Sequence, residues 1–183
     1  MFGNDRPVAV EYCSGNGDWV IAKALANPML NWVAVEKRFD RVRKIWSKMR
    51  NRGIDNLLIV CGEAQPFTRH YLFPQSVQEI YINFPDPWPK RGHAKHRLIQ
   101  KEFVADMARV TCENGSACLV TDDADYSAQM LREMKSSPVW RPQFDAPHYT
   151  TEWSGYGDSF FDTLWRAKGC TIRYHLYARG PDE

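Results

Sequence analysis

The feature of this sequence that most constrains its fold is an alternation of strand-sized apolar runs with helical patterns. Each run has the length of a buried strand, and the segments between the runs place apolar residues at helical spacing. Strands that alternate with helices predict a mostly parallel, doubly wound α/β sheet with helices on both faces. The expected strands are residues 8–13, 31–36, 56–62, 77–84 and 115–122, and the expected helices are residues 18–26, 40–52, 96–110 and 126–135.

The segment near the C-terminus has a different pattern from these parallel strands. Residues 170–179 alternate apolar and polar side chains and follow an aromatic stretch that is poor in helical pattern. Such alternation is typical of a strand with one solvated face, so we expect an antiparallel edge strand here. Its apolar positions are Ile172, Tyr174, Leu176 and Ala178.

Helical spacing also predicts which side of the first two helices faces the sheet. Pro28 follows the first helix, and Gly53 is the expected C-terminal stop of the second. The expected inward positions are Val20, Ala24 and Leu25 in the first helix, and Val42, Ile45, Trp46 and Met49 in the second.

The length of 183 residues predicts one domain that spans residues 1–183, and no repeat or linker suggests a boundary. No apolar run is long enough to cross a membrane, and the start of the chain lacks a signal-peptide pattern. Five cysteines without a C-x-x-C pair fit reduced thiols, so we expect a cytoplasmic protein without a metal site. These cysteines are Cys13, Cys61, Cys112, Cys118 and Cys170.

A glycine loop follows the first expected strand. Gly15 and Gly17 stand at the start of a helix, where small residues let a ligand approach the backbone and free N–H groups are available. Val20 occupies the place of the third small residue of a dinucleotide-binding loop. The loop therefore favours a nucleotide-like ligand and counts against a dinucleotide.

Three acids at strand ends extend this interpretation. Glu36 ends the second strand, nineteen residues after Gly17, where a carboxylate can accept from both hydroxyls of an adenosine ribose. S-adenosylmethionine has such a ribose and no phosphate. Glu11 suits the cationic end of that ligand, although loop N–H groups could equally satisfy it. Glu63 could accept from the adenine amino group, and it is the weakest of the three signals.

The stretch "INFPDPWPKRGHAKHR" joins a stiff acidic loop to a basic one. Pro85, Pro87 and Pro89 each fix φ and remove a donor, which would hold Asp86 and Trp88 in fixed directions. The alternative is a proline-rich strand exit with a packed tryptophan, which gives Asp86 no purpose.

Positive charge gathers in two segments of the chain. Residues 90–101 contain five Lys or Arg and two His but no acid, and phosphate binding is the simplest explanation. Residues 37–52 contain eight Lys or Arg and one acid. This second run is either an ordinary solvated helix face or an extension of the same phosphate-binding track.

The motif "NFPDPWPKRGHAKHR" strongly resembles the signature of the tRNA (guanine-N7-)-methyltransferase family of the bacterial single-subunit type. The resemblance runs from about Glu11 to Arg179. It implies a Rossmann-like class I methyltransferase fold, S-adenosylmethionine as the donor, and N7 of a guanine in the tRNA variable loop, nucleotide 46 in tRNA convention, as the target. The implied partner is tRNA, with no membrane and no metal, and the chain is expected to be a monomer or a homodimer.

The pattern and the resemblance together assign four groups of site residues, with Asp86 as the catalytic residue. The cofactor-binding residues are Glu11, Gly15, Gly17, Glu36, Glu63, Ala64 and Asn83. The substrate-binding residues are Lys90, Asp122, Ser159 and Asp162. The RNA contacts are Arg91, Gly92, His93, Lys95, His96 and Arg97.

The chain departs from the family pattern in three ways. Cys13 stands where relatives usually have the first glycine of the loop, and Ser159 and Asp162 replace Thr and Glu. The basic N-terminal segment of relatives is expected to be absent. Cys13 and the short N-terminus keep a non-catalytic RNA-binding module open as an alternative. Two further alternatives are an amino-group methyltransferase of adenine or glutamine and a nicotinamide oxidoreductase, which Val20 disfavours.

Overall fold

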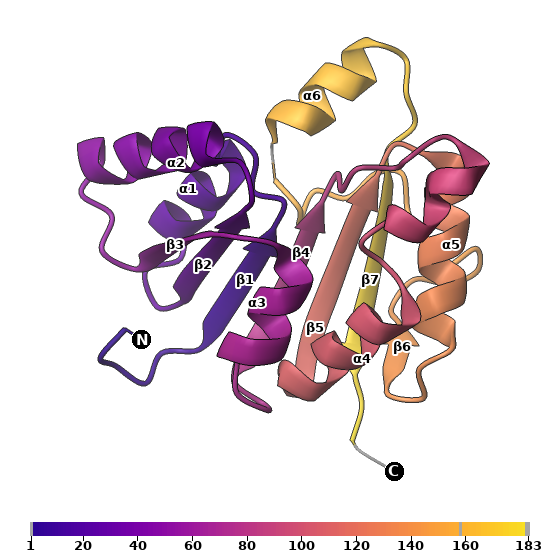
Figure 1. The fold of residues 1–183 in the computed structure, drawn as a ribbon, viewed down its shortest axis with the longest axis horizontal. Coiled ribbons are helices and arrows are strands. Elements are labelled where there is room, and N and C mark those ends of the chain that lie inside the picture. The colour runs from indigo at the N-terminus through magenta and orange to yellow at the C-terminus, as the bar shows by residue number, and fades with distance from the viewer. Residues whose placement is uncertain (1, 158, 182–183) are drawn as a thin grey trace.

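The structure is a computed structural model that describes residues 2–157 and 159–181, without the side chain of Arg91. Within these residues the strands form one seven-stranded sheet in the order β3-β2-β1-β4-β5-β7-β6 (Figure 1). The strands are β1 (Val8–Tyr12), β2 (Asn31–Glu36), β3 (Leu57–Cys61), β4 (Val77–Asn83), β5 (Thr111–Thr121), β6 (Trp140–Pro142) and β7 (Arg173–Arg179). The helices are α1 (Asp18–Ala26), α2 (Phe39–Asn51), α3 (Ala64–Tyr71), the 3-10 helix η1 (Arg91–His96), α4 (Lys101–Val110), α5 (Ala124–Lys135) and α6 (Phe160–Ala167).

The first five strands of the sheet run parallel, which confirms the predicted doubly wound fold. The chain winds outward from β1 to β3, then returns to place β4 on the other side of β1. This reversal between β1 and β4 opens a crevice at the carboxyl ends of the strands, where doubly wound sheets bind ligands. The loops after β1, β2 and β4 all reach this edge, so the sheet brings the glycine loop and the proline-rich loop together.

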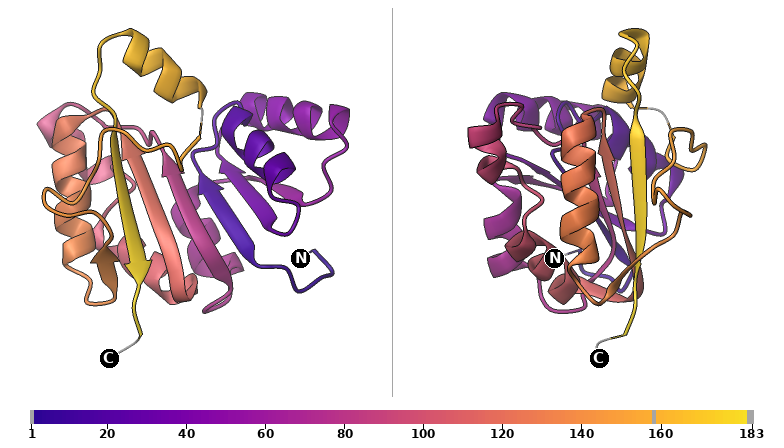
Figure 2. Two further views of the ribbon diagram at one scale, coloured as in Figure 1. Left: turned by 180° about the vertical axis from the view of Figure 1, so that it is seen from behind. Right: turned by 90° about the vertical axis from the view of Figure 1, so that its right-hand side faces the viewer.

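Two apolar layers cover the two faces of the sheet. On one face, Val10 and Tyr12 pack with buried residues of α3, α4 and α5. On the other face, Ala9 packs with α1, with Ile45 of α2 and with the aromatic segment at residues 149–157. The right-hand view of Figure 2 shows α5 and this late segment on opposite sides of β7. Successive strand residues alternate between the layers, which places Glu11 on the same side as Ala9.

The predicted antiparallel strand near the C-terminus is confirmed as β7, which pairs with β5. A three-residue strand, β6, pairs along its outer side, and the sequence pattern did not predict it. The C-terminal stop of α2 is also confirmed, because Gly53 has a φ of +62° and its N–H donates to Arg50.

Several boundaries and burial predictions were wrong. Residues 96–110 do not form one helix, because Arg97 and Gln100 are extended and α4 begins only at Lys101. Helix α3 was not predicted, since it has eight residues with Pro66 in its first turn. Strand β5 begins at Thr111 rather than at residue 115.

Two predicted core residues are exposed instead, namely Leu25 at 48% and Trp46 at 55%. Each follows a fully buried residue, Ala24 or Ile45, and therefore points about 100° away from it around the helix.

All five cysteines are free thiols. In the described part of the chain, no helix is long and apolar enough to cross a membrane, and no group of three or more His, Cys, Asp or Glu side chains could hold a metal ion.

Candidate active site

Two adjoining pockets open at the carboxyl ends of β1, β2 and β4, and both are bordered by Cys13, Phe84 and Phe161. The inner pocket is also lined by Glu11, Gly17, Asn83 and Ser159. The outer pocket is also lined by Glu36, Glu63, Ala64, Asp86, Trp88, Lys95, His96 and Arg97. The fold thus collects most of the predicted site residues around one cleft.

The glycine loop at the inner pocket requires its glycines at specific positions. Gly17 has a φ of +80°, and a Cβ atom there would lie 2.7 Å from Ile45 Cγ1 of α2. Gly15 has a φ of +56°, and its added Cβ would lie 3.2 Å from Phe161 Cε2. Left-handed backbone and close packing both favour glycine, so this loop brings its backbone close to α2 and α6.

Glu36 ties the glycine loop to the end of β2. Its side chain is 4% exposed, and its carboxylate accepts from the N–H of Gly15 and from the N–H of Arg38, both at 2.9 Å. Arg41 Nη1 lies 3.8 Å from the same carboxylate. Each oxygen accepts one of these N–H groups and has a second lone pair, and Glu36 lines the outer pocket, so it can support the loop and accept from ligand hydroxyls.

Glu11 and Asn83 form a buried polar pair beneath the inner pocket. Asn83 Nδ2 donates to Glu11 Oε1 at 2.8 Å, while Glu11 Oε2 and Asn83 Oδ1 have no hydrogen-bond partner. Burial raises the pKa of the Glu11 carboxyl to about 7. Two buried acceptors without donors at the wall of a pocket suit a cationic ligand group, which would supply the missing donors.

Three non-glycine residues around the cleft have positive φ. They are Cys13 at +62°, Phe84 at +48° and Trp88 at +43°. Left-handed backbone strains a residue that has a Cβ atom, and such strain gathers at functional loops that the surrounding fold holds in place. Cys13, which stands where relatives usually have the first loop glycine, therefore has the left-handed backbone that favours glycine.

Asp86 projects from the proline-rich loop into the outer pocket, where it is exposed. Its Oδ1 atom accepts from the N–H of Trp88 at 3.1 Å, which fixes the direction of the carboxylate. The Trp88 ring lies 5.2 Å from the ring of His96 and 5.9 Å from that of His93. The acid and the basic loop are therefore connected through one aromatic cluster.

The basic loop exposes Lys90, His93, Lys95 and His96 together with Gly92, as an anion-binding surface requires. The predicted RNA contact Arg91 begins η1, and its side chain lies outside what the structure describes.

Glu63 is exposed just before α3, whose first residue is Ala64, so this helix presents its N-terminus to the outer pocket.

Arg97 was predicted to contact RNA, but unlike Lys95 and His96 of the same loop it is buried. It is only 8% exposed, and its guanidinium donates to the Pro87 carbonyl at 2.6 Å and to Gln129 Oε1 at 2.9 Å. The guanidinium also lies 5.0 Å from the centre of the Tyr126 ring. Two of its N–H groups are thus used within the protein, so Arg97 anchors the proline-rich loop to α5, and its role as an RNA contact stays a prediction.

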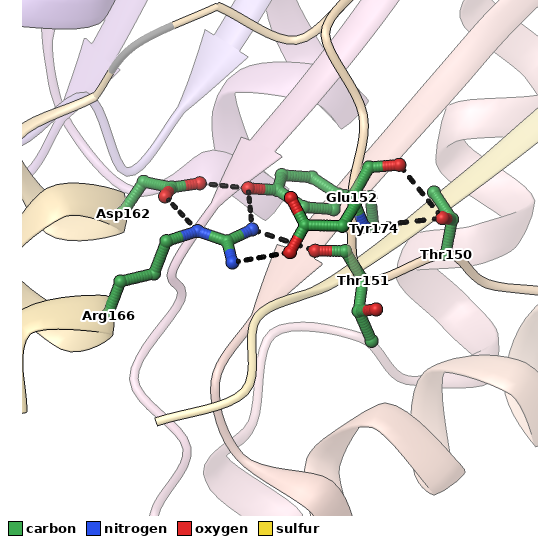
Figure 3. Close-up of polar contacts among 6 residues, drawn as sticks. All are labelled: Thr150, Thr151, Glu152, Asp162, Arg166 and Tyr174. Carbon is green, nitrogen blue, oxygen red and sulfur yellow. Dashed lines mark hydrogen bonds and ion pairs between the residues drawn. The ribbon is translucent and has the colours of Figure 1, made fainter. Parts of the chain in front are cut away.

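The predicted substrate contacts on α6 are also engaged within the protein (Figure 3). Asp162 accepts from Arg166 Nε at 2.8 Å and from the hydroxyl of Tyr174, and Arg166 also donates to Glu152 Oε1 at 3.0 Å. Ser159 caps α6 by accepting from the N–H of Asp162 at 3.0 Å. Both residues therefore help to hold α6 over the carboxyl ends of β4 and β5, where Figure 1 shows it.

Asp122 follows β5 and lies outside the lining of the two pockets, and burial raises the pKa of its carboxyl.

The sequence pattern did not predict Phe161, Arg166 and Tyr174 as residues of the site. The spacing of Arg166 four residues after Asp162 on a helix is the signal that could have indicated their pair.

Comparisons with known proteins place the chain among methyltransferases. A model of the family described as "Putative methyltransferase" matches residues 5–154. A protein of Chlamydia abortus named tRNA (guanine-N(7)-)-methyltransferase is 54% identical over 98% of this chain and 79% of its own length. A protein of Chlamydia caviae with the same name is 53% identical over the same shares. An rRNA methylase from Streptococcus thermophilus shares the fold, with a TM-score of 0.65 and 12% identity, over 97% of this chain and 89% of that one.

Proposed function

Because this chain belongs to the tRNA (guanine-N7-)-methyltransferase family, we propose that it methylates N7 of the guanine at nucleotide 46 in the tRNA variable loop, in the cytoplasm, with S-adenosylmethionine as the donor. The observation that carries this proposal is the shared cleft. The buried acid Glu11 lines the inner pocket, and the buried Glu36 and the exposed Asp86 both line the outer pocket. A small cationic donor and a nucleobase can therefore meet beside Phe84 and Phe161.

The residues around the inner pocket fit S-adenosylmethionine. Glu11 Oε2 and Asn83 Oδ1 are buried acceptors without a donor, and an ammonium group would complete them. Glu36, Glu63 and Ala64 line the adjoining outer pocket, where Glu36 would accept from the ribose hydroxyls and Glu63 with the backbone of Ala64 would contact the adenine edge. When bound, this cofactor supplies a methyl group on a cationic sulfur.

The chemistry at guanine N7 explains the residue types in the outer pocket. N7 carries a lone pair and no hydrogen, so its attack on the methyl group requires no general base. The methylated base becomes cationic, and a carboxylate nearby favours that developing charge. Asp86 has this role, and it orients the guanine by accepting from the N1–H and the N2 amino group.

The remaining predicted site residues either position the parts of the protein around the base or contact the RNA backbone. Asp122 follows β5 outside the lining of both pockets, and its substrate-binding role stays a prediction. Asp162 and Ser159 act as positioning residues, since they hold α6 and therefore Phe161 at the cleft. Lys90, Lys95 and the two histidines of η1 bind the phosphates that flank the target, together with Arg91 and Gly92.

Methylation of unmodified tRNA with a labelled donor tests the proposed function. The expected product after nucleoside digestion is 7-methylguanosine, and mapping should place it at nucleotide 46. A methyl group on an exocyclic amino group would overturn the proposal in favour of the amino-group methyltransferase. Binding of tRNA without any methyl transfer would favour the non-catalytic RNA-binding module.

A further inference from the structure

Helix α2 carries a row of alternating aromatic and arginine side chains, namely Phe39, Arg43, Trp46 and Arg50. Their spacing of four, three and four residues places all four on one face of the helix. We call this row the α2 stripe. Figure 1 shows α2 lying beside the carboxyl ends of β1 and β2, on the side of the sheet where the cleft opens.

The aromatic members of the stripe are open to solvent. Phe39 is 66% exposed and Trp46 is 55% exposed, whereas Ile45 on the opposite side of the helix is fully buried. The fold therefore uses the Ile45 side for packing and leaves the aromatic side without a partner. Exposed aromatic rings in a row indicate a contact surface, whereas scattered single ones do not.

The arginine members of the stripe are equally free in the described structure. Arg43 and Arg50 have no ion pair or side-chain hydrogen bond there. Other cations of the same segment are engaged, since Arg38 pairs with Asp40, Arg41 lies near Glu36, and Lys48 pairs with Asp18. Lys44, which is exposed about 100° around the helix from Arg43, also has no ion pair or side-chain hydrogen bond in the described structure. The combination of free cations with exposed aromatic rings therefore distinguishes the stripe from the rest of α2.

The stripe begins next to the cleft and leads away from it. Arg38 and Arg41, at the start of α2, line the same outer pocket as Asp86. Eleven residues separate Phe39 from Arg50, which corresponds to about 16 Å along the helix axis. A polyanion whose target group enters the outer pocket can therefore continue along α2.

We infer that the α2 stripe binds unpaired nucleotides of the RNA substrate outside the target base. Phe39 and Trp46 stack on bases, and Arg43 and Arg50 bind the phosphates between them. Aromatic rings interleaved with cations are the combination that binds single-stranded RNA, because stacking accepts any base and the cations follow the backbone. This inference rests on the proposed function for the identity of the RNA as tRNA.

The dissociation constant for unmodified tRNA, measured against salt concentration, tests the inference. We expect Trp46→Ala to weaken binding about tenfold, or about 1.4 kcal/mol, with an unchanged salt slope. Arg43→Ala and Arg50→Ala should each weaken binding and reduce the salt slope by about one. A neutral ring and a cation thus have different signatures, which mere loss of folding would not produce.

Matched variants elsewhere provide the controls. Lys44→Ala removes the same charge from α2, about 100° away from Arg43, and Phe73→Ala removes an aromatic ring that is 80% exposed after α3. Both should leave the dissociation constant within about twofold of the wild-type value.

Two outcomes would overturn the inference without affecting the proposed function. If the wild type methylates tRNA and Trp46→Ala binds as tightly as Phe73→Ala, the stripe is not an RNA contact. If Trp46→Ala instead converts a dimer to a monomer in sedimentation without changing RNA binding, the stripe binds a second copy of the chain. Failure of the wild type to methylate N7 would reject the proposed function, while tRNA binding by the variants still tests the stripe.

Discussion

The fold holds the buried and the exposed charges around the cleft in different ways. Glu11 at the inner pocket and Glu36 at the outer pocket are at most 4% exposed and are held by Asn83 and by backbone N–H groups. Asp86 and Lys95, which line the outer pocket, are exposed, and so is Lys90 between them in the sequence. In the proposed function, this difference means that the small donor is bound by desolvated groups fixed within the fold. The large polyanion would be bound instead by solvated charges whose contribution falls with salt.

The largest expected effect comes from the one exposed residue that we place at the reacting base. Asp86→Ala should reduce turnover of tRNA about 100-fold to 1000-fold, because the carboxylate that favours the cationic product is lost. Binding of S-adenosylmethionine, measured by calorimetry, should stay within about twofold. Asp86→Asn keeps an oxygen acceptor for the Trp88 N–H, so this variant shows the effect of losing the negative charge while the loop contact is kept. Equal losses in turnover and donor binding would show that Asp86 does not belong to the substrate end.

The next effect concerns Glu11 at the buried end. Glu11→Gln should weaken donor binding about 100-fold at pH 8, because the ammonium group of the donor loses its carboxylate partner. The wild-type affinity for the donor should also fall as the pH decreases below about 7, where this carboxyl becomes protonated. A donor affinity that is independent of pH between 5 and 8 would contradict this assignment.

The same substitution should stabilise the folded protein without ligand. The folded state holds the Glu11 proton up to about pH 7, whereas the unfolded chain releases it near pH 4.5. Stability therefore decreases as the pH rises from 4.5 to 7 and stays lower above that range. Glutamine avoids this loss, so thermal unfolding at pH 8 should show Glu11→Gln more stable by up to about 3 kcal/mol. At pH 4 the wild type and Glu11→Gln should have similar free energies of unfolding, which serves as the internal control.

The same contrast between buried and exposed charge explains what sequence could predict. The parallel direction of the strands and the meeting of Glu11, Glu36 and Asp86 at one edge follow from alternation and strand ends, and the sequence indicated them. The separate positions of Lys95 and Arg97 did not follow, because two cations in one basic run look alike until burial is known. The partners of Asp162 could not be predicted either, since Arg166 and Tyr174 become its neighbours only through α6 and β7.

Arg97 and Lys95 therefore provide the next test, within one loop. Arg97→Ala should destabilise the protein by about 2 kcal/mol, because it leaves the Pro87 carbonyl and Gln129 without a donor and unfastens the loop. Lys95→Ala should change stability by less than about 0.5 kcal/mol but reduce the salt slope of tRNA binding by about one. Urea unfolding and tRNA binding of both variants check the pair. Loss of stability with Lys95→Ala instead would reverse our assignment of anchor and contact.

The smallest expected effect tests whether the inner pocket depends on backbone conformation rather than on the side chain at position 13. Cys13→Gly relieves a φ of +62°, which favours folding by about 1 kcal/mol. It also gives the unfolded chain more freedom and removes packed sulfur, and these losses are of similar size. Thermal unfolding should therefore differ from wild type by less than about 1 kcal/mol, with donor affinity within twofold.

Gly17→Ala provides the contrasting substitution in the same loop, because its new Cβ atom would lie 2.7 Å from the buried Ile45. That variant should lose more than about 2 kcal/mol of stability, along with donor binding. If Cys13→Gly proved as damaging as Gly17→Ala, the thiol itself would have to support the loop. If Cys13→Gly remains neutral while Gly17→Ala is damaging, the first loop needs glycine-like backbone at position 13 and the absence of a side chain at position 17. That result would also show that the buried part of the cleft depends on a fixed backbone conformation as well as on fixed charges.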